Sequence, residues 1–128
     1  MVIDSSAILA ILGSVPEASD MAMAIENDLI RVISAASLLE SAIVIESRHG
    51  IAGSNKLDEL ISFSQIQIEP VTAEQISIAR FAYRKYGKGC HPASLNFGDC
   101  FSYALAKFRG EPLLYVGNDF SQTDILSV

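Results

Sequence analysis

The chain has 128 residues, of which half are hydrophobic and 19% are charged. This length and composition are those of one domain with a proper hydrophobic core. The net charge of −6 argues against a protein that coats nucleic acid through its overall charge.

The sequence contains no apolar run of about 18 residues that would span a membrane. The start, MVIDSSAILAIL, carries Asp4 and lacks a basic n-region, so we expect neither a membrane span nor a signal peptide, and hence a cytoplasmic protein. The two cysteines, Cys90 and Cys100, form no CxxC pair and are expected to be reduced thiols that serve packing. A zinc site could also use His49 and His91, but the spacing matches no standard ligand pattern.

In chain order, the first half predicts two strands and four helices. Short apolar runs predict strands at residues 1–4 and 31–34. Apolar periodicity and capping residues predict helices at residues 5–13, 16–27, 35–48 and 54–63, the last of them capped by Ser54.

The second half predicts a strand at residues 66–70, a helix at 72–86 opened by a capping box of Thr72 and Gln75, a loop, and a helix at 96–110. A strand at residues 112–116 follows, and LSV at the end adds a short edge strand. Strands that alternate with helices predict the α/β class, with a central, mostly parallel sheet of four to five strands and helices on both faces.

The helix at residues 96–110 carries one carboxylate among apolar and small residues. A helical wheel gathers a stripe that we expect to face the core, formed by Phe97, Phe101, Ala104, Leu105 and Phe108. Asp99 falls on the opposite side, away from any lysine or glutamate, so we expect it to be poorly hydrated. Such a carboxylate takes up a proton, accepts hydrogen bonds or meets a cation. The simplest explanation is capping, with Asn96 as N-cap and Asp99 at position N3.

Three further acids lie where the expected sheet would bring them to one rim. In a doubly wound sheet, the site lies beyond the carboxyl ends of the strands, where the next helices begin. Asp4 ends the first strand, Glu40 lies early in the helix after RVIS, and Asp119 follows PLLYV. Each has a structural alternative: a helix cap, a capping box of Glu40 with Ser37, and a turn.

Four carboxylates on one rim would repel one another unless protons or a cation compensated them. Hard oxygen ligands suit Mg²⁺ or Mn²⁺. Nucleophile chemistry is disfavoured, because Cys100 has no obvious histidine partner and neither G-x-S-x-G nor a phosphate-binding glycine loop occurs.

A local basic strip interrupts the acidic sequence. No carboxylate occurs between Gln75 and Gly98, and the basic residues in this window are Arg80, Arg84, Lys85 and Lys88, with His91 nearby. The strip is either an ordinary solvated helix face with a flexible loop or a surface that contacts RNA phosphates.

Four stretches resemble a PIN domain, most closely a VapC-type toxin ribonuclease of a type II toxin–antitoxin system. They are the initial VIDSSA, SLLESAIVIE, LNFGDCFSYALAK and LLYVGNDFSQTDI. The resemblance runs nearly end to end and implies a single PIN-like domain over residues 1–128.

The resemblance implies a metal-dependent endoribonuclease. It makes Asp4, Glu40, Asp99 and Asp119 the acidic set around one or two Mg²⁺ or Mn²⁺ ions, with Asp4 and Asp99 as direct ligands and Ser5 or Ser6 as a supporting hydroxyl. Many relatives carry Thr or Ser where this chain has Gly117, which weakens the assignment of Asp119. Two reserve acids, Asp124 and Glu46, are better explained as a turn acid and a solvated helix acid.

The resemblance also implies partners: an RNA substrate, a VapB-type antitoxin that pushes a basic side chain into the acids, and a second copy in a homodimer. The apolar residues 7–12 and 38–45 supply either a docking groove or part of the core. Two rival functions are a phospho-acceptor signalling domain and a degenerate PIN fold that only binds proteins. The single acid after the first strand argues against the first, and the four acids argue against the second.

Overall fold

The computed structural model describes all 128 residues and has the expected α/β fold. Its four strands form one sheet in the order β3-β2-β1-β4, and every neighbouring pair is parallel. The strands are β1 (Val2–Ile3), β2 (Val32–Ser34), β3 (Gln67–Glu69) and β4 (Leu113–Leu114). Where a short edge strand was expected at the end of the chain, one parallel bridge joins Ser127 to Leu113.

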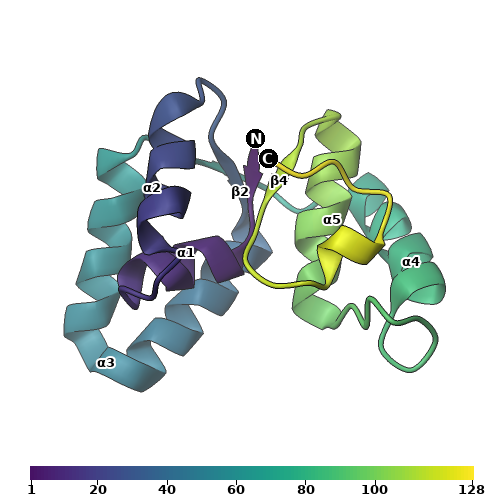
Figure 1. Cartoon of the computed structure of the whole chain (residues 1–128), viewed down its shortest axis with the longest axis horizontal. Helices are drawn as coiled ribbons and strands as arrows, with labels where there is room; N and C mark the ends of the chain where they lie inside the picture. Colours follow the sequence, from purple (N-terminus) through teal and green to yellow (C-terminus); the bar gives the residue numbers. More distant parts are fainter.

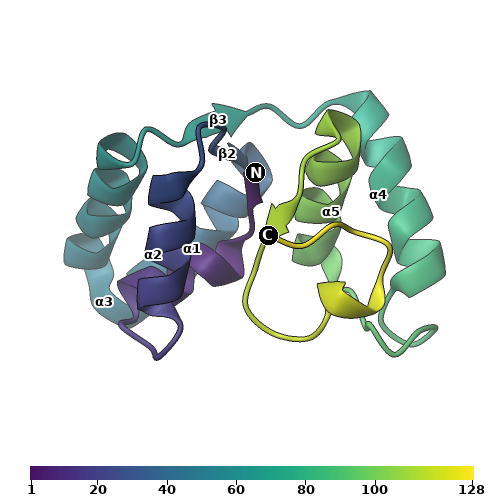
Figure 2. The same cartoon turned by 45° about the horizontal axis from the view of Figure 1, so that its top comes forward.

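Five α-helices cover the sheet in two layers. They are α1 (Ser5–Leu12), α2 (Ala18–Asn27), α3 (Ala35–Phe63), α4 (Ala73–Tyr86) and α5 (Phe97–Arg109), and a short 3₁₀ helix, η1 (Phe120–Gln122), follows β4. Helices α1 to α3 lie on one side of the strands and α4 and α5 on the other (Figure 1). In Figure 2 the chain leaves β3 and crosses to α4, where the second layer begins.

Each helical layer packs its own hydrophobic cluster against the sheet. Ile8, Ile45 and Leu57 are buried on the side of α1 to α3. Tyr103 and Leu105 are buried on the side of α4 and α5. Because β1 lies between β2 and β4, the residue that follows it stands at the middle of the sheet edge.

Local capping explains why the sequence predicts some helix ends well. The Asn96 side chain accepts a hydrogen bond from the backbone at position N3, and Gly110 ends α5 in the left-handed conformation. Thr72 caps α4 by accepting from Gln75 N–H, but the Gln75 side chain donates to the Pro70 carbonyl instead of completing a capping box.

The prediction of two separate helices at residues 35–48 and 54–63 is only half right. A break does occur, at Gly50, whose φ of 61° and ψ of −152° are not helical. The second segment is not capped by Ser54, which lies inside α3. Glycine adopts this backbone conformation without the strain that a side chain would add, so the chain turns at Gly50.

The predicted core stripe of α5 is wrong for two of its three phenylalanines, whereas Phe101 is half-buried. Ala104 and Leu105 are buried, whereas Phe97 is 79% exposed and Phe108 is 45% exposed. The helix instead turns small residues such as Gly98 and Ser102 toward α3 and the sheet, because small side chains allow the elements to approach closely. No helix in the structure has the length and apolar character that a membrane crossing requires.

Candidate active site

Asp4 lies at the middle of the carboxyl edge of the sheet, directly after β1. It is the N-cap of α1, and its side-chain Oδ2 accepts a hydrogen bond from Ser6 N–H at 3.0 Å. Its Oδ1 accepts from the Ser102 hydroxyl at 2.5 Å. The residue is only 3% exposed, so these donors take the place of water around the carboxylate.

Glu40 reaches the same edge from α3. Its Oε1 accepts a hydrogen bond from the Ser5 hydroxyl, and its carboxylate lies against Gly98. The capping box of Glu40 with Ser37 is not formed, because Ser34 caps α3 and the Ser37 hydroxyl instead lies 3.0 Å from the Ser102 hydroxyl. The Glu40 carboxylate therefore accepts its hydrogen bond from Ser5 at the sheet edge and takes no part in capping its own helix.

Asp99 is both a capping residue and a member of the acid group. Its Oδ2 accepts Asn96 N–H at 2.9 Å, and its own N–H donates to Asn96 Oδ1 at 2.9 Å, which completes a capping box. The pKa of Asp99 is raised to about 6, mainly by burial and additionally by the charges of Asp4, Asp119 and Glu40, against the lowering effect of the Asn96 N–H. The other three predicted acids therefore lie close enough for their charges to act on Asp99.

Asp119 approaches from the segment after β4 and is the most exposed of the four. It precedes η1, and its side chain makes no capping hydrogen bond. Gly117, two residues earlier, has a φ of 108°, a backbone conformation that favours glycine over residues with a side chain. Nearby, the Ser6 hydroxyl accepts Val116 N–H at 3.0 Å and so fastens α1 to this segment.

The acid group lacks a positive partner within the protein. All four ion pairs of the structure lie elsewhere, and none involves Asp4, Glu40, Asp99 or Asp119. Carboxylate oxygens of this kind fit Mg²⁺ or Mn²⁺, and a cation would offset both the burial of the Asp99 charge and the repulsion from the other acids, which together raise its pKa. No three acidic, cysteine or histidine side chains stand close enough to hold one ion as they are, so the carboxylates would have to draw together around it.

The alternative chemistries find little support in this geometry. The Cys100 thiol is buried and donates to the Asn96 carbonyl at 3.3 Å, and burial together with the Asp99 charge raises its pKa to about 11. A thiol held in its protonated form is a poor nucleophile. Cys90 is exposed, and no zinc site forms with the histidines.

The two reserve acids have other surroundings. Asp124 accepts hydrogen bonds from Tyr103 and Lys107 at 2.7 and 2.8 Å. Burial works to raise the pKa of Asp124, but these two donors hold it below the usual range. Glu46 is exposed on α3.

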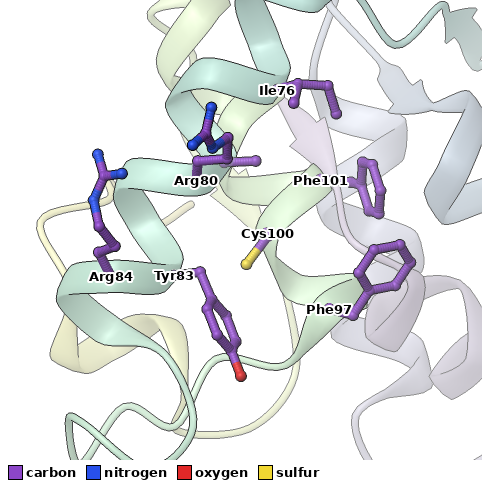
Figure 3. Close-up of a pocket in the computed structure, with 8 residues that line it drawn as sticks. Ile76, Arg80, Tyr83, Arg84, Phe97, Cys100 and Phe101 are labelled. Carbon is purple, nitrogen blue, oxygen red and sulfur yellow. The ribbon is translucent and has the colours of Figure 1, made fainter.

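The four basic residues of the predicted strip have different surroundings in the structure. Arg80 and Arg84 line a pocket of about 630 Å³ between α4 and α5, which also contains Phe97 and Phe101 (Figure 3). Lys85 instead lies 5.7 Å from the ring centre of Phe81 and 5.2 Å from that of Tyr86. Lys88 is exposed in the loop after α4. None of these four basic residues forms an ion pair.

Three residues at this edge were not predicted: Ser37, Ser102 and Gly98. The available signal was their spacing, since Ser37 precedes Glu40 by three residues and Ser102 follows Asp99 by three, which places each near its acid on a helix. Small residues in an apolar helix also indicate close packing, which the sequence could not assign to a partner.

Comparison with known proteins identifies the family to which this chain belongs. The PIN domain sequence pattern matches residues 1–126. Ribonuclease VapC30 of Mycobacterium tuberculosis is 51% identical over 128 residues, which cover 100% of this chain and 98% of that protein. Ribonuclease VapC of Mycolicibacterium smegmatis is also 51% identical, with 100% and 99% covered.

Two solved structures share the fold at low sequence identity. The crystal structure of VapC20 of Mycobacterium tuberculosis, described as a sarcin-ricin loop cleaving toxin, matches with a TM-score of 0.81 at 16% identity, covering 99% of this chain and 97% of that one. A toxin–antitoxin complex from Klebsiella pneumoniae matches with a TM-score of 0.74 at 14% identity, covering 99% and 95%. The chain therefore belongs to the PIN-domain family and, within it, to the VapC ribonucleases.

Proposed function

We propose that this chain is the toxin of a type II toxin–antitoxin module, and that it cleaves RNA with four carboxylates that hold Mg²⁺ or Mn²⁺. The observation that carries the proposal is the setting of Asp99: burial first, and then the charges of Asp4, Asp119 and Glu40, raise its pKa, and no basic side chain pairs with any of the four acids. Such a group of carboxylates favours the binding of a divalent cation.

Asp4 and Asp99 are the proposed direct ligands, because both stand where an element begins and are held by backbone N–H groups. Glu40 and Asp119 complete the group or orient the attacking water. When bound, the cation would polarise the scissile phosphate and lower the pKa of that water. In-line attack would then leave a 5′-phosphate and a 3′-hydroxyl.

The basic residues of α4 and of the loop that follows it are proposed to hold the substrate. Arg80, Arg84, Lys85 and Lys88 are exposed and free of ion pairs, so they are available to phosphates that flank the cut. Binding would then combine a cation-filled acidic centre with a basic flank, despite the net charge of −6.

Two protein partners are proposed as well: a VapB-type antitoxin and a second copy of this chain, all in the cytoplasm. The name of the Klebsiella pneumoniae structure supports an antitoxin partner. Leu39 and Ile43 of α3 are 61% and 59% exposed and are available for docking, whereas Ala7, Ile8 and Ala10 in the other apolar segment belong to the core.

The proposal is tested by RNA cleavage with purified protein. Wild-type chain with Mg²⁺ should cut RNA, EDTA should stop the reaction, and Asp99→Asn should fold and still bind RNA without cutting it. Sequencing the 5′ ends made when each form is expressed would identify the cleaved RNA. Equal cleavage by wild type and Asp99→Asn would overturn the assignment, and absence of cation-dependent cleavage by the wild type would favour a degenerate, protein-binding PIN fold.

A further inference from the structure

A line of buried hydroxyl groups ends on the Asp4 carboxylate. Ser102 of α5 donates to Asp4 Oδ1 at 2.5 Å, and the Ser37 hydroxyl of α3 lies 3.0 Å from that of Ser102. The exposed fractions are 0% for Ser102, 2% for Ser37 and 3% for Asp4. Water therefore does not compete for these hydrogen bonds, and the two hydroxyl groups have few alternative partners.

The direction of the protons along this line follows from the chemistry of the groups. The Ser102 hydroxyl donates to Asp4 Oδ1, so its one proton lies toward that carboxylate. The Ser102 oxygen can then only accept from Ser37, which must donate. The hydrogen bonds therefore run in one direction, from Ser37 through Ser102 to Asp4.

Both oxygens of Asp4 are held by different parts of the protein. Oδ2 accepts Ser6 N–H from α1, and Oδ1 accepts the Ser102 hydroxyl from α5. Two donors on opposite oxygens restrict rotation of the carboxylate plane and leave the remaining lone pairs in one orientation. A cation ligand benefits from such restraint, because the Asp4 oxygens then keep their orientation while the other carboxylates move toward the cation.

The same hydroxyls tie together the helices that carry the other acids. Ser102 is three residues after Asp99 on α5, and Ser37 is three residues before Glu40 on α3. Their hydrogen bonds therefore join both helices to the acid at the end of β1.

We propose that Ser102 and Ser37 are positioning residues that orient the Asp4 carboxylate for a divalent cation. They act through Asp4, Ser37 by way of Ser102, and neither takes part in the reaction itself. The inference rests on the proposed function, because it requires Asp4 to bind a cation. Loss of a group that orients a metal ligand typically weakens metal affinity about 10-fold to 100-fold.

Calorimetric titration of the metal-free full chain with Mn²⁺ tests the proposal. Ser102→Ala should weaken Mn²⁺ binding by about 10-fold or more. Ser37→Ala should weaken it less, because Ser102 keeps its own bond to Asp4. The double variant should bind no more weakly than Ser102→Ala, since Ser37 acts only through Ser102. In cleavage assays, Ser102→Ala should need more Mn²⁺ for half-maximal rate, yet approach the wild-type kcat at saturation.

Ser41→Ala is the matched control. Ser41 is 0% exposed and one turn after Ser37 on α3, but its hydroxyl donates to the Ser37 backbone carbonyl at 2.8 Å and stays outside the line to Asp4. It should bind Mn²⁺ like the wild type. If Ser102→Ala does not fold, the comparison of Ser37→Ala with Ser41→Ala decides the matter alone.

Three results would overturn the inference: unchanged Mn²⁺ binding by folded Ser102→Ala and Ser37→Ala, equal losses in Ser37→Ala and Ser41→Ala, or additive losses in the double variant. The first leaves the proposed function intact, because the wild type still binds Mn²⁺. A wild-type chain that binds no Mn²⁺ would instead overturn the proposed cation site, and the inference with it.

Discussion

The carboxylate of Glu40 occupies the space that a side chain on Gly98 would need. A Cβ at Gly98 would stand 1.9 Å from Glu40 Oε2 and 2.7 Å from its Cδ, far inside contact distance. The approach of α3 to α5 at the acid group therefore depends on a residue without a side chain.

Gly98→Ala should reduce cleavage while the fold survives. The clashing atoms are the flexible end of Glu40, which can swing away from Ser5, and alanine favours the helix by about 1 kcal/mol. We expect the free energy of unfolding, measured by urea titration, to change by less than about 1 kcal/mol, and cleavage to fall on the order of 100-fold from misplacement of Glu40. Glu40→Gln is the companion variant, since it removes the charge without the clash. Full activity in Gly98→Ala would show that the position of Glu40 is unimportant.

Asp99→Asn should stabilise the metal-free protein at neutral pH. The folded-state pKa of about 6 lies above the ordinary 3.8, so the folded chain binds more protons between these values and loses stability as pH rises through them. This loss of folding stability is complete above about pH 6 and absent below about pH 4. Thermal melts in EDTA should give the variant a higher Tm than wild type at pH 8, with the difference vanishing near pH 4. A difference that persists at pH 4 would point to a change in capping and not in charge.

Cation binding should depend on pH through the same group. Mg²⁺ must displace the proton from Asp99, so its affinity should rise as pH increases through about 6 and level off above. The rise in wild-type Tm on adding saturating Mg²⁺ should therefore be larger at pH 7.5 than at pH 5. In Asp99→Asn this rise should be small at both pH values. An Mg²⁺ effect that is independent of pH would exclude Asp99 as a ligand.

Replacing Arg80 and Arg84 together with alanine should weaken RNA binding. Both residues line the pocket between α4 and α5, and neither guanidinium group forms an ion pair. Each phosphate contact to single-stranded RNA contributes about 0.7 to the slope of log affinity against log salt concentration. The double variant should lower this slope by about 1.4, measured with Ca²⁺ in place of Mg²⁺ to prevent cleavage. Lys56→Ala, an exposed change on α3, should leave the slope unchanged.

Gly50→Ala should destabilise the protein without affecting its chemistry. The φ of 61° and ψ of −152° at Gly50 cost a residue with a side chain about 1 to 3 kcal/mol. Urea titration should detect this loss, while cleavage at 20 °C should match the wild type. No loss of stability would mean that α3 tolerates another path between its two segments.

Short-range signals explain which parts of this fold the sequence predicts. Asn96 and Gly110 mark both ends of α5 because each acts on backbone groups within one turn. Ser54 misled the prediction of α3 because a serine also fits the interior of a helix, and the actual break at Gly50 is a backbone turn. The glycine is visible in the sequence, but only its dihedral angles in the structure show that the helix breaks there.

Long-range packing explains what the sequence could not predict. A helical wheel shows that Phe97 and Phe108 share a side of α5, but both sides of this helix contain apolar residues, and the small ones face the sheet. The acids at the strand ends were predictable because the topology of a parallel sheet sets their place. The partnership of Ser37 with Ser102 joins residues 65 positions apart, and no local pattern specifies it.

The position of β1 between β2 and β4 also bears on the synthesis of the protein. On a ribosome that has made only residues 1–90, Asp4 and Glu40 exist, but α5, β4 and the other two acids do not. The strand before Asp4 then lacks one of its two neighbours, and the Ser102 hydroxyl has not been added. The proposed four-acid site is therefore incomplete in a nascent chain until the last quarter of the polypeptide has emerged and folded.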